Sequence, residues 1–86
     1  MTPGADEIQG WIVSRVGDLL GRPVELIDVK APLTRHGLDS VALVALASDL
    51  EKWLGYRFRA NPLQDHPTIE ALSVFLAGEV AKSSPR

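Results

Sequence analysis

The sequence places one hydroxyl where a long helix is expected to begin. Gly37, Leu38 and Asp39 form a short turn, and Ser40 starts a stretch without glycine or proline that ends at Gly55. Asp39 suits an N-cap, because its carboxylate can accept a backbone N–H of the first turn. At this positive end of the helix dipole a phosphate is favoured by about 0.3–1 kcal/mol. These residues alone leave two interpretations: Ser40 is an attachment point, or it only helps to begin the helix.

A nucleophilic role for Ser40 has little support from its neighbours. His36 is four residues away, and no acid is clearly placed to orient it, so we expect His36 to be a solvated loop residue. The Gly-x-Ser-x-Gly pattern of many serine hydrolases is absent. The chain has no cysteine, and its histidines lack metal-binding spacing. We expect no catalytic residue, no metal site and no enzymatic activity, and we expect His66 in a turn or packing role.

The stretch that follows Ser40 has two distinct faces at helical spacing. Its core face comprises Leu43, Leu46, Ala47, Leu50, Trp53 and Leu54. The opposite side carries Val41, Val44, Ala45, Ser48 and Lys52. Its first three members make it more apolar than a solvated face requires. Two explanations remain open for this second face: it docks a partner protein, or the preceding loop covers it.

Two further helices and one short one are predicted around this segment. The first opens at Asp6 and stops at Gly21, with core positions Ile8, Trp11, Ile12, Val16, Leu19 and Leu20. A brief helix is expected over residues 61–65, with Asn61 as its cap and Pro62 at its first position. The last runs over residues 68–82, with core positions Ile69, Leu72, Phe75, Leu76 and Val80.

The connection between the first two long helices is itself unusually long. It covers residues 21–38, and loops beyond about 12–15 residues are often functional. We expect its apolar side chains to hold it against the core: Val24, Leu26, Ile27, Val29 and Leu33. Residues 24–28 fit a helical turn, with a strand as the alternative. The predicted fold is all-α, a small three-to-four-helix bundle with a long first loop.

Length and composition narrow the functional classes. The 86 residues predict a single domain over residues 1–86, with an ordered core of about 5–81, and 45% of them are apolar. A net charge of −2 provides no basic field for nucleic acid. No apolar run approaches the roughly 20 residues of a membrane span, and no signal peptide is evident. We expect a monomer that works in the cytoplasm without a nucleic-acid or membrane partner.

Motifs over most of the chain resemble acyl carrier protein domains, above all those of polyketide and mixed polyketide–peptide pathways. The likeness runs from about Glu7 to Ala81 and is carried by Pro32-Leu33, by Gly37-Leu38-Asp39-Ser40, by Val41 and Leu43-Val44, and by Asp65-His66-Pro67-Thr68-Ile69. It implies a 4′-phosphopantetheine arm on Ser40, beside Asp39 and Leu38. It also implies that the thiol of the arm holds acyl groups as thioesters during polyketide or lipopeptide-type biosynthesis.

The resemblance also implies a set of partner enzymes. A phosphopantetheinyl transferase would attach the arm and contact Asp39, and a ketosynthase or condensation-type enzyme would use the acyl group. Residues 49–55 are similar to carriers that fatty acyl-AMP ligases load. One departure concerns charge. Many carriers present acids along this helix, whereas here the outer positions include Ala42, Ala45 and Ser48. We therefore expect partners to read this face by hydrophobic contact more than by charge.

Two alternatives come from the same residues. A peptidyl carrier of a nonribosomal peptide pathway usually has Gly-Gly before the residue that precedes the serine, and Gly37-Leu38 argues against it. A small helical module that binds protein or DNA is compatible with three helices and a glycine turn. The net acidity and the lack of a basic recognition helix oppose DNA binding.

Overall fold

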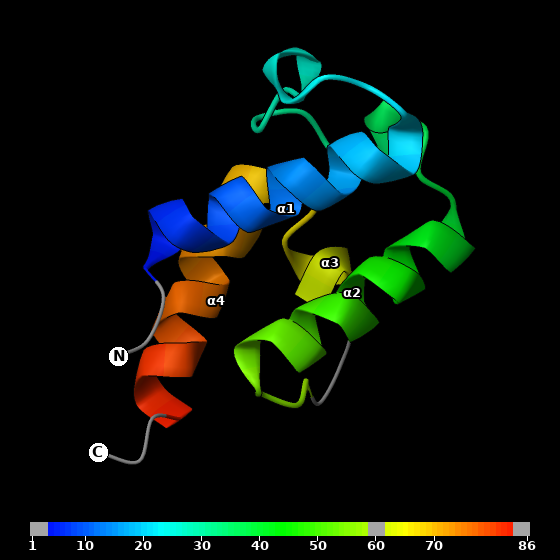
Figure 1. The fold of residues 1–86 in the computed structure, drawn as a ribbon. Helices are drawn as coiled ribbons and strands as arrows, with labels where there is room; N and C mark the ends of the chain where they lie inside the picture. Colours follow the sequence, from blue (N-terminus) through cyan, green and yellow to red (C-terminus); the bar gives the residue numbers. More distant parts are fainter. Residues whose placement is uncertain (1–3, 59–61, 84–86) are drawn as a thin grey trace.

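The fold of the chain, given by a computed structural model, is built from helices alone in the residues that the structure describes, 4–58 and 62–83 (Figure 1). This confirms the predicted all-α bundle with a long first loop. The elements in order are α1 (Ala5–Leu20), the 3-10 helices η1 (Val24–Leu26) and η2 (Leu33–His36), α2 (Ser40–Leu54), α3 (Pro62–Asp65) and α4 (Ile69–Ser83). The cap expected at Asn61 lies outside the described residues.

Helix α1 packs chiefly against α4, which it crosses in Figure 1. Ile8, Ile12 and Val16 are fully buried at a spacing of four residues. Gly21 ends the helix in a left-handed conformation with φ 66°, which glycine adopts without strain. The expectation that Leu19 belongs to the core is wrong, because it is exposed. Leu20, four residues after Val16, is half-buried and packs against the core as predicted.

One apolar core joins all the long helices. Its fully buried members are Ile8, Ile12, Val16, Leu46, Leu50, Ile69, Leu72 and Leu76, with Leu33 of the long loop beside them. Each side chain of this size contributes about 1.5–3 kcal/mol when fully buried. Helix α2 is therefore held in place by its core face, which leaves the other face free for contacts outside the bundle.

The long first loop is held to the start of α4 by backbone hydrogen bonds. The N–H of Leu33 donates to the carbonyl of Pro67 at 2.7 Å, and the N–H of Glu70 donates to the carbonyl of Val29 at 3.0 Å. Ile27 and Leu33 are buried as expected. Residues 24–26 form a 3-10 turn, so the helical interpretation is confirmed and the strand alternative is wrong.

Two side chains of the same turn do not hold the loop to the core. Val24 and Leu26 are exposed, which corrects the expectation that all the apolar loop residues pack inward. A single 3-10 turn can direct only part of its side chains toward the core. Here the buried side chain is that of Ile27, the residue that directly follows the turn. The loop is therefore held by fewer side chains than its composition indicates.

A polar and aromatic contact links α1 to α2. The rings of Trp11 and Trp53 stack at a centroid distance of 5.1 Å, and Arg15 forms an ion pair with Asp49. Trp53 was expected in the core, yet it is 39% exposed. One face of its large ring is covered by Trp11 while the rest remains in solvent. His66 stacks on Phe75 at 4.2 Å, which confirms its packing role.

Candidate functional site

The turn before α2 fixes the direction in which this helix begins. Gly37 ends η2 with φ 95°, in the left-handed region that favours glycine, and its N–H donates to the carbonyl of Thr34 at 3.2 Å. Leu38 is only 6% exposed and packs into the core. Asp39 follows in an extended conformation, and its Oδ1 accepts the N–H of Ala42 at 2.8 Å. The predicted N-cap role of Asp39 is confirmed.

Ser40 is the first residue of α2 and is exposed. Within residues 4–58 and 62–83, no group forms a hydrogen bond with its hydroxyl. The N–H groups of Ser40 and Val41 likewise have no partner there, as is usual in a first helical turn. The site therefore presents a free hydroxyl beside unpaired backbone donors, a setting that accommodates a phosphate ester.

His36 differs from its expectation as a solvated loop residue. It is 8% exposed, and its Nε2 lies 2.9 Å from the carbonyl oxygen of Asp28. Since a carbonyl can only accept, Nε2 carries the proton and donates it. The 3-10 helix η2 turns the ring inward, where this bond satisfies Nε2. His36 thus fixes the loop.

Leu38 is buried in the core cluster, and its implied role beside the arm stays a prediction. The four residues predicted to face partner proteins are accessible to solvent. Val41 is 77% exposed, Val44 is 60% exposed, Ala45 is exposed, and Ser48 is half-buried. The first loop therefore does not cover this face, which removes one of the two explanations left open by the sequence.

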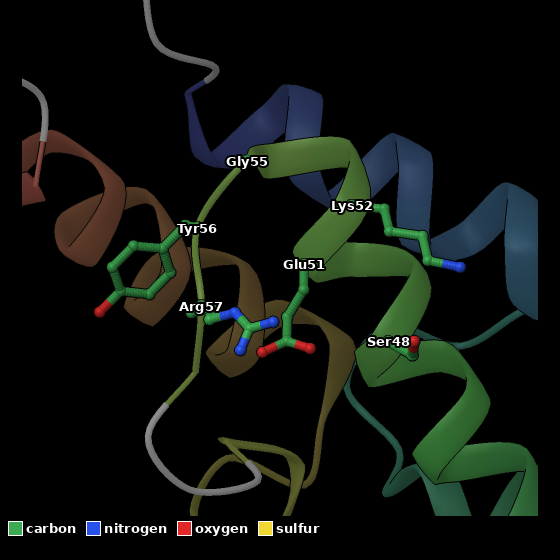
Figure 2. Close-up of a pocket in the computed structure, with 6 residues that line it drawn as sticks. All are labelled: Ser48, Glu51, Lys52, Gly55, Tyr56 and Arg57. Atoms are coloured by element: carbon green, nitrogen blue, oxygen red, sulfur yellow. The ribbon is translucent and has the colours of Figure 1, made fainter.

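A polar pocket at the other end of α2 was not predicted from the sequence. Its volume is about 390 Å³, and Figure 2 shows its lining residues, Ser48, Glu51, Lys52, Gly55, Tyr56 and Arg57. Gly55, with φ 67°, turns the chain back so that Arg57 lies near the last turns of α2. The sequence predicts that α2 ends at Gly55, but no neighbouring residue indicates the direction that the chain takes after it.

Replacing Asp39 with alanine is expected to lower the free energy of unfolding by about 0.5–2 kcal/mol, because the N–H of Ala42 loses its acceptor. Asp39→Asn should retain most of the stability, since its amide oxygen can accept the same bond. Urea unfolding followed by circular dichroism measures both. Equal losses in the two variants would show that the charge of Asp39 matters more than its capping bond.

No helix in the described part of the chain is long and apolar enough to cross a membrane. The same residues contain no group of three or more histidine or acidic side chains placed to hold a metal ion.

Comparison with known proteins identifies a family for this arrangement. Residues 10–76 match the family described as "Phosphopantetheine attachment site". The acyl carrier protein TtuC of Teredinibacter turnerae is 33% identical over 75 residues, which cover 87% of this chain and 86% of TtuC. Polyketide synthase GfsA of Streptomyces halstedii is 39% identical over 67 residues, which cover 77% of this chain but 1% of the synthase.

Solved structures agree with this assignment. A free-standing peptidyl carrier protein from Acinetobacter baumannii superposes with a TM-score of 0.83 at 28% identity, covering 90% of this chain and 96% of the other. The acyl carrier protein LipD from Actinoplanes friuliensis superposes with a TM-score of 0.75 at 37% identity, covering 94% of this chain and 90% of LipD. The chain belongs to the phosphopantetheine-binding acyl carrier proteins, which bear 4′-phosphopantetheine covalently on a serine.

Proposed function

We propose that Ser40 is the serine that bears the arm. The region that matches the family, residues 10–76, contains four serines: Ser14, Ser40, Ser48 and Ser73. Ser73 is buried and its hydroxyl donates to the carbonyl of Ile69 at 2.7 Å. Ser14 and Ser48 lie inside helices, away from unpaired backbone donors. Ser40 alone among them begins a helix, and this position with its free hydroxyl is the observation that supports the assignment.

The electrostatic surroundings of Ser40 suit a phosphodiester. The helix dipole favours negative charge at this end, and the unpaired N–H groups of the first turn are available to phosphate oxygens. The carboxylate of Asp39 opposes a second anion, but one of its oxygens is engaged by the N–H of Ala42. The helix dipole and the free N–H groups therefore favour the phosphodiester on Ser40, while the charge of Asp39 disfavours it. Buried Leu38 contributes by anchoring the turn.

The covalent step needs no catalytic group in this chain. The Ser40 oxygen displaces adenosine bisphosphate from coenzyme A: a P–O bond forms to Oγ, the bond to the leaving phosphate breaks, and the hydroxyl proton passes to the transferase. When attached, the arm supplies the thiol that this cysteine-free chain lacks and holds an acyl group as a thioester. The protein's own contribution is to hold the attachment oxygen in solvent on a rigid helix.

We further propose that Val41, Val44, Ala45 and Ser48 contact the enzymes that act on the carrier: the phosphopantetheinyl transferase, an acyl-loading enzyme such as a fatty acyl-AMP ligase, and a ketosynthase or condensation-type enzyme. Their exposure next to Ser40 supports this role. An enzyme that reaches the arm must approach the start of α2, so it meets these side chains first.

Incubation with coenzyme A and a broad-specificity phosphopantetheinyl transferase tests the assignment. We expect the intact mass to rise by one phosphopantetheinyl group, and peptide mapping should place the added mass on the segment that contains Ser40. An unchanged mass under these conditions, or an addition on Ser14 or Ser48, would contradict the proposal.

A peptidyl carrier is the second candidate, because a carrier of that kind superposes well on this chain. The Gly37-Leu38 pair before Asp39 and the acyl carriers among the relatives favour the acyl reading. Loading of the modified protein by amino-acid-activating enzymes and by fatty acyl-AMP ligases, followed by mass measurement of the thioester, distinguishes the two.

A further inference from the structure

The acidic residues from Asp39 to the end of α2 are all engaged within the chain. Oδ1 of Asp39 accepts the N–H of Ala42 at 2.8 Å, and Asp49 is paired with Arg15 of α1. Oε2 of Glu51 accepts the N–H of Phe58 at 2.7 Å. Arg15 compensates the charge of Asp49, whereas Asp39 and Glu51 each accept one backbone N–H and keep their negative charge. Asp39 lies before the first helical residue of α2, and Glu51 is directed to the chain that follows Gly55.

Among the charged residues of α2, Asp49 and Glu51 are half-buried and bonded within the chain, and Lys52 alone is exposed. Within the described residues no carboxylate pairs with it. It follows Ser48 by four residues, and Figure 2 shows the two side chains on the same side of α2. The exposed face therefore runs from Val41 and Val44 near Ser40 to a cation at the far end.

The pocket beyond Lys52 extends this positive end. Lys52 and Arg57 contribute two positive charges to its lining and Glu51 one negative charge, which leaves a net charge of +1. Figure 2 shows the side chains of Glu51 and Arg57 pointing toward one another, but among the described residues neither Arg57 nor Lys52 forms an ion pair with Glu51. The volume of about 390 Å³ gives room for a side chain of another protein. A carboxylate is the group whose charge complements this pocket.

We propose that α2 docks an enzyme surface in which an apolar patch is bordered by carboxylates. The apolar patch lies against Val41 and Val44, and the carboxylates lie against Lys52 and Arg57. This inference rests on the proposed carrier function and adds the charge of the partner. An acidic partner is the opposite of what the net charge predicts, since a net charge of −2 by itself favours a basic partner. A preference for an acidic surface would therefore come from the local arrangement on α2.

Two synthetic helical peptides with the same leucine face provide the probe, one flanked by glutamates and the other by lysines. Each is titrated at low salt into isotope-labelled protein while backbone amide shifts are followed. We expect the glutamate peptide to shift the amides of residues 41–57 and to bind about three- to tenfold more tightly than the lysine peptide, as two exposed charge pairs allow. Added salt should reduce the difference.

Charge reversal assigns the preference to one residue. Lys52→Glu is expected to remove or reverse the preference for the glutamate peptide. Lys82→Glu is the control for adding an acid near a helix C-terminus, because Lys82 is also exposed and also lies in the last turn of a 15-residue helix. Unlike Lys52, Lys82 pairs with Glu79 at 3.5 Å, so its reversal should cost somewhat more stability, and both variants are checked by circular dichroism before the titration. The control should bind as the wild-type protein does.

Three results would overturn the inference: equal or tighter binding of the lysine peptide, shifts confined to residues outside α2 and the pocket, or no shift with the glutamate peptide. The gain of mass at Ser40 is measured on the same samples. A protein that takes up the arm but shows any of these results leaves the carrier function intact and refutes only the charge of the partner.

Discussion

A Ser40→Ala variant is expected to take up no phosphopantetheine and yet to fold as the wild-type protein does. The substitution removes the only oxygen through which the phosphodiester can form at the start of α2. Its structural cost should be small, because the Ser40 hydroxyl is exposed and no described group bonds to it. A change in the free energy of unfolding within about 0.5 kcal/mol is expected for such a surface site. Intact mass after treatment with coenzyme A and the transferase, and urea unfolding, measure the two effects.

Serines elsewhere in the chain provide the controls. Ser14→Ala should gain the same mass at the same rate as the wild-type protein, since Ser14 lies within α1 and not at a helix start. Ser48→Ala should reach the same final mass, with any difference confined to the rate because Ser48 lies on the proposed docking face. A Ser40→Ala protein that is folded and still gains the mass would place the arm on another serine. A Ser40→Ala protein that loses its helical circular dichroism would instead show that the hydroxyl supports the fold.

The start of α2 was predictable because its determinants are local. Asp39 caps the helix through a bond to a residue three positions away, and the αL glycine at Gly37 precedes it. Both effects depend on the identity of neighbouring residues and hardly on the rest of the fold. The position of Ser40 follows from them, and so does its exposure at the first helical residue.

Residues that were misjudged depend on partners distant in the sequence. His36 is buried because η2 folds it onto the carbonyl of Asp28, eight residues away. Trp53 stacks on Trp11 of α1, which covers one face of its ring, and 39% of the residue remains exposed. Helical periodicity assigns a face to each side chain, but it does not say how far the neighbouring helix extends over that face.

The charge that α2 presents also depends on partners distant in the sequence. The sequence contains the acids Asp49 and Glu51 on this helix, and the fold shows that Arg15 and the N–H of Phe58 bond to them. The pairing with Arg15 spans 34 residues, and that with Phe58 requires the turn at Gly55. The composition of a helix is therefore a poor guide to the charge that it presents to a partner.

Replacing Leu46 with alanine is expected to cost about 2–5 kcal/mol of unfolding free energy, the range for truncating a buried leucine. Leu46 is fully buried and belongs to the face of α2 that packs into the core. The total stability of a chain of 86 residues is roughly 4–13 kcal/mol by the usual value per residue. The loss is thus a large share of the total, and it acts on the helix that presents Ser40. Urea denaturation followed by circular dichroism measures it.

Val44→Ala is the matched control on the same helix, two residues away and 60% exposed. Its cost should stay within about 0.5 kcal/mol, because little apolar contact is lost at an exposed site. If one face of α2 packs into the core and the other docks partners, Leu46→Ala lowers stability, whereas Val44→Ala weakens only the contact with partner enzymes.

In the mass assay, Val44→Ala should slow attachment of the arm by raising the KM of the transferase for the carrier. Equal losses of stability in the two variants would mean that Val44 packs within the bundle, and the docking face would then have to lie elsewhere.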